Sequence, residues 1–368
     1  MTLRKATTVI WVALVALSLP TWAAVDTRAI DGVLQKSVLA SRDLGVIDAF
    51  VAQAVKNVLR TKDDTKVAED RAILLSRVSA QGQYAQQFSE SALKHITASL
   101  ELASALPEAR ASVATMNLLI LVHDLKDVSL VDLALDRLSE PRAPVAFWAA
   151  SIATSETLVT AIHRHAGSAL GQRVTSRLSD LVTDGCAPEV LNLITEFASS
   201  LDGIDGQDML LAIADLRMAQ YEQWSVENEQ LDTTLLKSLC TRINQNTSDR
   251  ERLAMRFGQL YSYVIQRYAK GANSLRELQK RRTLGVIAEV EDKCIGTMLG
   301  APSSALMRAL ERQDVTLLLA AHDALLGSRA RVGSLVTKLQ FSYGRAADGS
   351  DQKWPKPLQG PLAPNLSE

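Results

Sequence analysis

The chain has 368 residues, of which 47% are hydrophobic and 22% are charged, and its formal net charge is −1. This composition is typical of a globular chain long enough for one extended domain or two compact ones, and bulk charge favours no class of partner. Cys186, Cys240 and Cys294 follow no Cys-x-x-Cys spacing and are too few to staple a chain of this size, so we expect buried thiols, with one disulfide as the alternative.

The first residues predict an export signal. A short basic segment, an uncharged apolar run and a group of small residues follow one another at Arg4-Lys5, Val9–Leu19 and Thr21-Trp22-Ala23-Ala24. Because this is the pattern of a secretory signal peptide, we expect residues 1–24 to be removed after Ala23 or Ala24, leaving a periplasmic or secreted protein. An uncut signal would instead leave residues 6–24 as one short membrane anchor, near the lower end of the ~17–25 residues that span a bilayer.

The body of the chain is helical by its pattern. Apolar residues recur at steps of three and four, between Gly, Asp and Pro breaks, and no stretch alternates apolar and polar residues for long enough to predict a strand. The pattern predicts helices within 30–38, 47–58, 63–78, 84–103, 113–123, 128–138, 144–153, 158–165, 170–181, 190–201, 209–224, 231–243, 253–268, 284–299, 305–310, 315–326 and 332–339. Helix after helix with short links excludes a parallel-sheet enzyme fold.

Breaks in this pattern divide the chain into regions. The polar loop 201–208 separates an N-terminal helical region, 25–201, from a C-terminal one, 209–340, and Asp208 is a candidate cap for the following helix. From 341 to 368 the glycines and prolines break all periodicity, so this tail should be extended or disordered.

One stretch carries a family resemblance. Residues 140–153 form a proline turn that leads into an alanine-rich helix, in which Pro144 suits a first helical turn. With Val145, Ala149 and Ala150, this resembles a HEAT-type (armadillo-like) repeat, whose Pro-containing turn joins two antiparallel helices. Ala146 stands where the family carries a basic residue.

The spacing of other prolines extends that resemblance over residues 100–200. Pro107 precedes Pro144 by 37 residues and Pro188 follows it by 44, near the ~40–47 residue HEAT period. The resemblance implies an all-α, irregular α-solenoid of antiparallel helix pairs, with a compact multi-helix bundle as the alternative.

Charge is segregated along the C-terminal half. Eleven acidic residues and one basic residue, Arg217, lie between 184 and 232, whereas nine basic and two acidic residues lie between 250 and 282. One interpretation is a basic surface for an anionic partner, formed by Arg276, Lys280, Arg281 and Arg282. The other is that oppositely charged layers face each other or are solvated.

Aromatic residues interleave with the basic block, and the predicted location of the chain limits its partners. Tyr261 and Tyr268 fall on an apolar stripe that indicates core packing, while Tyr263 does not. Export argues against nucleic acid and leaves another protein or an anionic envelope component as the partner.

Two short patterns resemble metal sites without meeting their requirements. His163 and His165 are two apart, so on a helix they point in different directions and cannot chelate one ion unless the helix ends there. Asp202, Asp205 and Asp208 step by three, the wrong spacing for a calcium loop. We therefore predict no metal and no cofactor.

A catalytic interpretation rests on equally short matches. Ser91 and Lys94 match Ser-x-x-Lys, but its companion motifs are absent. The sequence therefore predicts an exported helical scaffold or protein-binding module with no catalytic activity of its own. The alternatives are an envelope-tethered structural protein and an enzyme whose site assembles from dispersed residues. In that enzyme, the histidines to inspect are His95, His123, His163, His165 and His322.

Overall fold

The computed structural model describes residues 27–79, 82–165, 167–245 and 249–361. These residues form two compact units that divide between Leu102 and Ala103. The described residues are all-helical and contain no strand, only two isolated bridges, between Ser328 and Arg331 and between Arg345 and Asp351. The predicted all-α class is confirmed. The predicted signal peptide, residues 1–24, lies outside the described residues.

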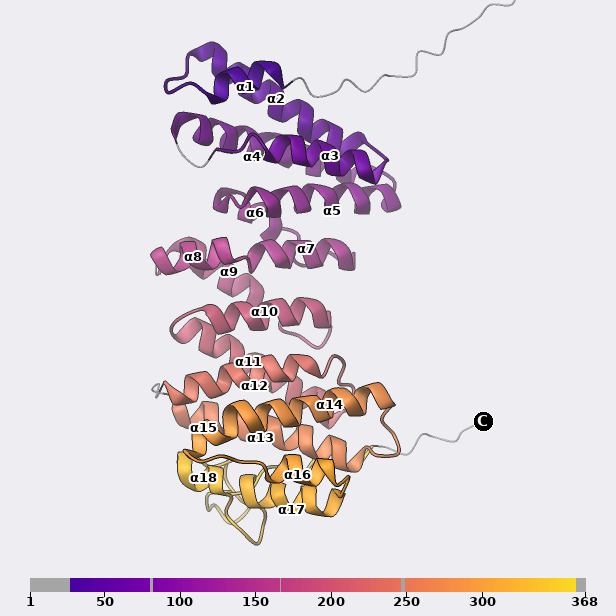
Figure 1. Cartoon of the computed structure of the whole chain (residues 1–368), viewed down its shortest axis with the longest axis vertical. Helices are drawn as coiled ribbons and strands as arrows, with labels where there is room; N and C mark the ends of the chain where they lie inside the picture. Colours follow the sequence, from indigo (N-terminus) through magenta and orange to yellow (C-terminus); the bar gives the residue numbers. More distant parts are fainter. Residues whose placement is uncertain (1–26, 80–81, 166, 246–248, 362–368) are drawn as a thin grey trace, which may run out of the picture. The chain divides into compact units, whose positions relative to one another are not determined.

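The first unit is built from helices packed around one apolar face. Its helices are α1 (Arg28–Leu34), α2 (Ser41–Arg60), α3 (Asp64–Leu75) and α4 (Gly82–Ser104), which reaches the division (Figure 1). Along α2, Ile47, Val51 and Ala54 recur at steps of three and four and are fully buried. Because such spacing lines one side of a helix, it gives α2 a core face, against which α1 and α3 pack.

The second unit holds the remaining helices, which follow one another with short connections. Their bounds are α5 (Glu108–Leu125), η1 (Val128–Leu130), α6 (Val131–Leu135), α7 (Ala143–Ala153), α8 (Glu156–Arg164), α9 (Ala169–Ser179), α10 (Pro188–Ser200), α11 (Ile204–Glu222), α12 (Gln230–Asn244), α13 (Arg250–Lys270), α14 (Glu277–Val290), η2 (Glu291–Ile295), α15 (Gly296–Leu299), α16 (Ala305–Glu311), α17 (Val315–Leu326) and α18 (Ser334–Leu339).

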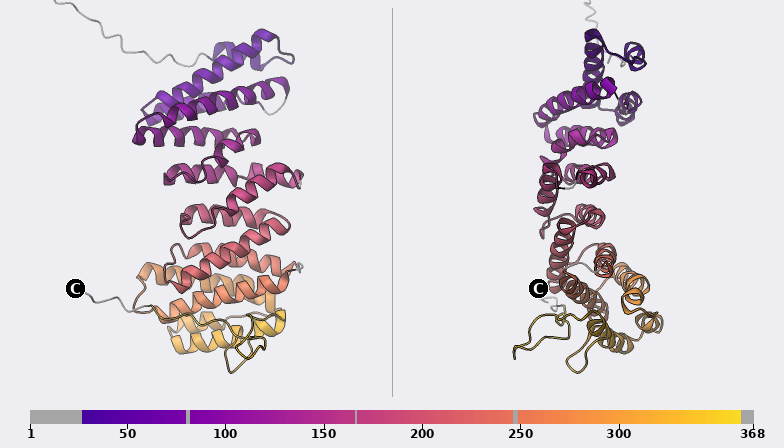
Figure 2. Two further views of the ribbon diagram at one scale, coloured as in Figure 1. Left: turned by 180° about the vertical axis from the view of Figure 1, so that it is seen from behind. Right: turned by 90° about the vertical axis from the view of Figure 1, so that its left-hand side faces the viewer.

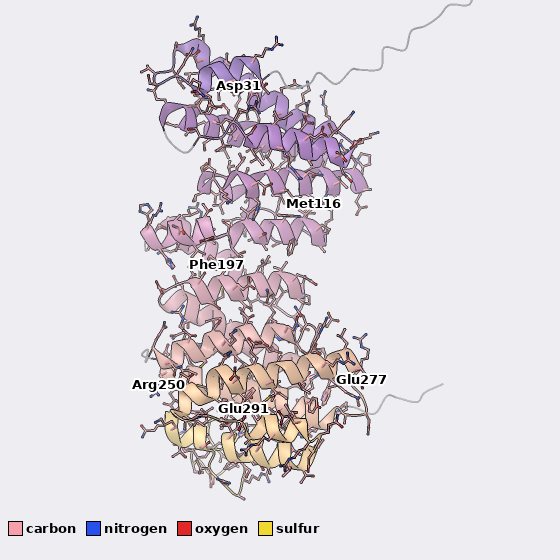
Figure 3. The ribbon with its side chains drawn as sticks, in the orientation of Figure 1. Asp31, Met116, Phe197, Arg250, Glu277 and Glu291 are labelled. Carbon is pink, nitrogen blue, oxygen red and sulfur yellow. The ribbon has the colours of Figure 1, made fainter. Side chains whose placement is uncertain are left out.

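Within the second unit, each helix packs mainly on helices close to it in the chain. α5 and α10 both contact α7, α10 contacts α11 and α12, and α13 contacts α11, α12, α14 and α17 (Figures 1 and 2). The interior between these helices is apolar, and its fully buried side chains include Leu118, Ile194, Leu236, Phe257 and Ile287. α13 therefore lies at the centre of the C-terminal part, with neighbours on several sides (Figure 3).

The three prolines that carried the family resemblance all begin helices. Pro107 is the N-cap of α5, Pro144 lies in the first turn of α7, and Pro188 is the first residue of α10. A proline tolerates these positions because the first helical N–H groups have no intrahelical acceptor. The helix predicted to start at Pro144 starts one residue earlier, at Ala143, and the helix predicted within 190–201 starts at Pro188. The HEAT-type solenoid remains a prediction.

The predicted boundary at 201–208 lies inside the second unit, at a tight corner between α10 and α11. α11 begins at Ile204, so Asp208 lies within the helix, and the prediction that it caps the helix is wrong. Gly203, with φ of 86°, precedes the helix. A Cβ atom on Gly206 would lie 2.6 Å from the Ala198 carbonyl oxygen, so only glycine lets the two helices approach this closely.

Among the described residues, one segment, residues 143–164, is apolar and long enough to cross a membrane by length and composition alone. It covers α7 and α8, which meet at Thr154 and Ser155, where the Ser155 hydroxyl caps α8 by accepting from the Leu158 amide. Only a third of the segment is buried. A core segment of a globular protein passes the same test of length and composition.

The segment after α18 was predicted to be extended or disordered, and its described part is non-helical and held against α13. It contains no helix from 341 to 361, but Pro355 and Leu358 are buried. The Lys356 and Leu358 amides donate to the side chains of Gln259 and Gln266 on α13, each at 2.8 Å. The segment stays ordered without a helix because polar side chains of α13 accept hydrogen bonds from its backbone amides. Residues 362–368 lie outside the described part.

Candidate functional site

The acidic and basic blocks of the sequence meet across neighbouring helices. Arg252 and Arg256 on α13 pair with Asp208 and Asp215 on α11, at 3.4 and 3.2 Å. Opposite charges therefore neutralise each other between the two helices, as the second interpretation of the charge pattern predicted. Much of the basic block thus has partners inside the protein and does not form a free cationic surface.

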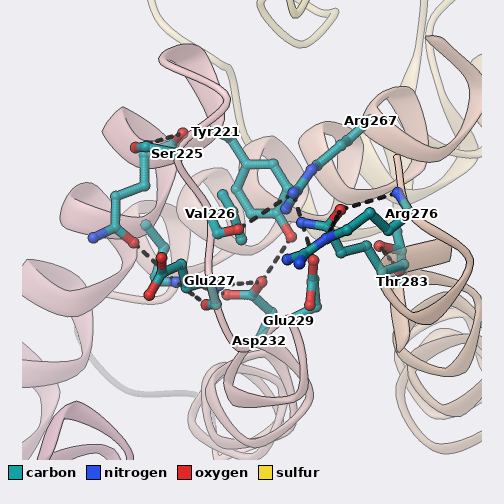
Figure 4. Close-up of polar contacts among 12 residues, drawn as sticks. Tyr221, Ser225, Val226, Glu227, Glu229, Asp232, Arg267, Arg276 and Thr283 are labelled. Carbon is teal, nitrogen blue, oxygen red and sulfur yellow. Dashed lines mark hydrogen bonds and ion pairs between the residues drawn. The ribbon is translucent and has the colours of Figure 1, made fainter. Parts of the chain in front are cut away.

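A buried polar network joins α11, α12 and α13 (Figure 4). Arg217 donates to both carboxylate oxygens of Asp232, from Nε at 2.7 Å and from Nη2 at 2.9 Å, and both side chains are almost fully buried. The Tyr221 hydroxyl also donates to Asp232, at 2.7 Å. Burial lowers the pKa of Arg217, but Asp232 more than offsets this and holds the pKa above its ordinary value.

A second buried pair completes the network. Arg267 of α13 lies 3.4 Å from the Glu229 carboxylate, and both side chains are 1% exposed. Its guanidinium also lies over the Tyr221 ring, 5.6 Å from the ring centroid, and donates to the Val226 carbonyl. Burial and the Asp232 charge raise the pKa of Tyr221 well above its ordinary value, which keeps the phenol protonated as a donor. The network fixes the three helices and is closed to solvent.

The predicted site residues lie at the start of α14, at the edge of this network. Arg276 precedes the helix and bonds Gln279 through its amide and its Nε, at 3.1 and 3.4 Å. Lys280 pairs with Glu277 at 2.9 Å. Within the described residues, Arg281 and Arg282 make no hydrogen bond or ion pair, although the Arg281 charge acts on Glu277. The Arg281 and Arg282 charges thus differ from those of Arg252, Arg256 and Arg267, which have acidic partners.

The helix spreads these side chains around its axis. Arg276 is the extended N-cap residue, whereas Lys280, Arg281 and Arg282 follow one another around the helix at about 100° per residue. That the four cations form one binding surface stays a prediction.

A pocket of about 210 Å³ opens beside Lys280, between the end of α13, the start of α14 and the α16–α17 turn. Its apolar lining comes from Ala272, Ala309, Leu310, Val315 and Leu318, and its polar lining comes from Tyr268, Lys280, Gln313 and Asp314. Val315 in the wall and Leu278 in the first turn of α14 are 38% and 58% exposed. A pocket with this lining suits a ligand that carries an apolar group next to an anionic group.

The tyrosines of the basic block separate into core and site residues. Tyr261 and Tyr263 are fully buried and donate to the Ile287 carbonyl and to Glu222, at 2.9 and 2.6 Å. Tyr268, predicted to pack in the core, is only partly buried and lines the pocket. The residues of the α16–α17 turn gave no signal in the sequence, because their role depends on a contact with α14 far away in the chain.

The five histidines do not converge on a common site within the described residues. His95 lies 2.9 Å from Asp48, His123 lies 3.2 Å from Asp124, and His163 lies 3.8 Å from Asp202. α8 ends at Arg164, with His165 as its C-cap. The described residues contain no group of three metal-ligating side chains.

His322 belongs to a hydrogen-bonded chain that resembles a nucleophile with its base. The Ser262 hydroxyl lies 2.8 Å from His322 Nε2, and His322 Nδ1 lies 2.9 Å from Asp323. Ser262 is fully buried in the middle of α13 and also accepts from Gln266. A nucleophile must reach its substrate, so this chain fits a role in joining α13 to α17 rather than in acyl transfer.

The residues of the remaining short sequence patterns also make contacts that stabilise the fold. Ser91 is buried and accepts from Gln87, while the Lys94 ammonium binds Asp48 at 3.1 Å. Asp202 lies in the connection before α11, and Asp208 pairs with Arg252. Ser91 and Lys94 thus bond to separate partners in the first unit.

Comparisons of the chain with protein-family models, with curated proteins and with solved structures gave no match.

Proposed function

We propose that the chain is an exported helical binding module, without catalytic activity of its own, that takes an acidic peptide segment of another protein at the start of α14. An aliphatic or aromatic side chain of that segment would enter the pocket, and its flanking carboxylates would lie against Arg276, Lys280 and Arg281. The observation that carries the proposal is the pocket itself, which has apolar walls and a lysine at its rim.

Charge complementarity supports an acidic occupant over a neutral one. Two of α13's cations, Arg252 and Arg256, pair with acidic residues of α11, and a third pairs with Glu229. The Arg281 and Arg282 side chains make no hydrogen bond or ion pair with other described residues. A ligand carboxylate placed here would find donors that need not first break an internal pair. Exposed charges of this kind give specificity and association rate more than affinity, so the apolar pocket would supply much of the binding free energy.

The test measures binding of labelled acidic peptides, each with one central leucine or phenylalanine, by fluorescence anisotropy. Replacing Arg276, Lys280, Arg281 and Arg282 with glutamine should weaken binding about ten-fold, if each charge contributes a few tenths of a kcal/mol. The same change should flatten the dependence of the dissociation constant on salt. Ala272→Phe, which fills the pocket, should remove the preference for a central apolar residue.

The matched control removes the same number of charges elsewhere in the second unit, at Lys237, Lys293, Arg331 and Lys338, whose side chains are also exposed. This control should bind as the unchanged protein does. Equal affinity of the site variant and the control would contradict the proposed surface. Binding to phosphatidylglycerol vesicles, with no binding to any acidic peptide, would contradict the proposed class of partner.

A further inference from the structure

Two of the three cysteines lie together in the interior of the second unit. Cys240 is in α12 and Cys294 is in the π-helical turn η2, and these two elements pack on each other. The Cys240 thiol donates to the Cys294 carbonyl at 3.9 Å, and the two thiols lie close enough to shift each other's pKa. Both side chains are less than 5% exposed, and in the structure both are free thiols.

The π-helical turn holds Cys294 in a defined position. Its first residue, Glu291, is 1% exposed and accepts from the Leu306 and Met307 amides, at 3.0 and 2.7 Å, and from the Ser303 hydroxyl. These bonds anchor the turn to the start of α16. The turn also packs on α12, where the Cys294 carbonyl accepts from the Cys240 thiol, so Cys294 lies in a helical turn and not on a loop.

The surroundings of the pair favour reaction at Cys240. The contact with Cys294 lowers the pKa of the Cys240 thiol more than burial raises it, and Asn244 donates to the same sulfur at 3.6 Å. The Cys294 pKa is raised by the contact with Cys240 and by burial. Because the thiolate is the nucleophile and must reach the external disulfide, we assign the first attack to Cys240, during folding and before the thiol is buried.

We propose that Cys240 and Cys294 form a disulfide bond when the protein folds in an oxidising compartment. The Cys240 thiolate attacks an external disulfide, releases one thiol of it and forms a mixed disulfide. Cys294 then loses its proton, attacks the Cys240 sulfur and releases the second thiol. Two protons and two electrons leave the pair, and the external disulfide, of a small molecule or an oxidoreductase, is reduced to two thiols.

Such a bond would join α12 to the run of helix that follows α14, across 54 residues of sequence. It would remove conformational freedom from the unfolded chain, which is how disulfides stabilise proteins in the loop-entropy description. Cys186 would stay reduced, since it lies in the connection before α10 and donates to its neighbour, the Ala187 carbonyl, at 3.7 Å. This inference does not rest on the proposed binding function.

The experiment refolds the full chain from urea in a buffer of reduced and oxidised glutathione, then denatures it and labels free thiols with N-ethylmaleimide. We expect one labelled thiol, at Cys186, and before labelling an intact mass about 2 Da below the fully reduced chain, for the two hydrogens lost. The melting temperature should exceed that of the reduced protein by on the order of 5 °C, and dithiothreitol should abolish the difference.

Serine variants separate the pair from the third cysteine. Cys186→Ser should leave no labelled thiol after oxidative refolding, whereas Cys240→Ser and Cys294→Ser should each leave two. Three labelled thiols in the unchanged protein, or a peptide map that joins Cys186 to either partner, would overturn the proposal. Refolding in vitro does not depend on export, so the result is independent of the signal peptide.

Discussion

The basic block of the sequence divides into two regions of different character. On α13, Arg252, Arg256 and Arg267 find acidic partners on α11 and in the segment before α12. At the start of α14, Arg281 and Arg282 make no hydrogen bond or ion pair within the described chain. Charged residues that are adjacent in the sequence can therefore have different roles. Those with an acidic partner on a neighbouring helix stabilise the fold, and those without one are free to bind a ligand.

The largest expected effect comes from breaking the interior pair. Arg217→Ala would leave the Asp232 carboxylate buried with only the Tyr221 hydroxyl as a side-chain donor. Removing one member of a buried ion pair typically costs about 3–5 kcal/mol. We expect a loss of that size in the free energy of unfolding, measured by urea denaturation.

The double variant Arg217→Met with Asp232→Leu is the control for this prediction. It removes both charges and leaves neither unpaired, so it should be less destabilising than Arg217→Ala. If the single variant unfolds within about 1 kcal/mol of the unchanged protein, the network does not hold α11 to α12 as described.

An intermediate effect is expected at the contact between the C-terminal segment and α11. Glu222 accepts from Lys356 at 2.8 Å and from Tyr263 at 2.6 Å, and Lys356 first and then Tyr263 hold the pKa of Glu222 below its ordinary 4.5. A lowered carboxyl pKa stabilises the folded state above pH 4.5, and that stabilisation disappears as the pH falls through the folded-state value.

Thermal denaturation of the unchanged protein and of Glu222→Gln checks this prediction. The unchanged protein should melt at the higher temperature at pH 7, and the two melting temperatures should converge as the pH falls through the folded-state pKa of Glu222, which lies below 4.5. Since the Glu222 side chain is 43% exposed, the difference should be modest and should shrink in high salt. A difference that persists at pH 3 would point to packing and not to charge.

The smallest effect on stability is expected at the edge of α14. Replacing Arg281 and Arg282 with glutamine removes no internal bond, so the free energy of unfolding should change by less than about 0.5 kcal/mol. Urea denaturation of this variant and of Arg256→Gln, which breaks the pair with Asp215, tests the contrast. A larger loss in the α14 variant would mean that its charges hold the fold after all.

The sequence predicted well where the helices lie, but it did not predict which side chains pair with residues far away in the chain. Apolar periodicity and the prolines at 144 and 188 located the helices because those signals are local. The isolation of Arg217 in an acidic block was visible, but its partner Asp232 lies 15 residues away on another helix. The ordered contacts of residues 341–361 were missed since their bonds come from α13 side chains, which no local pattern reveals.

The candidate site shows the same limit. The sequence located the cations at 276–282 but not the pocket beside Lys280, because half of its wall comes from α16 and α17. It also left the arrangement of the four cations open, which the helical twist decides. The pairing of Cys240 with Cys294 depends in turn on the packing of η2 against α12.

The segment that follows α18 has a consequence for the order of events during synthesis. Gln259, Gln266 and Lys270 of α13 bond to residues 356–358, made about 90 positions later. On the ribosome, α13 can pack against α11 and α12 while these three side chains are still hydrated. The nascent protein therefore completes the polar contacts of its central helix only when that late segment has emerged, and until then this side of α13 is open to chaperones.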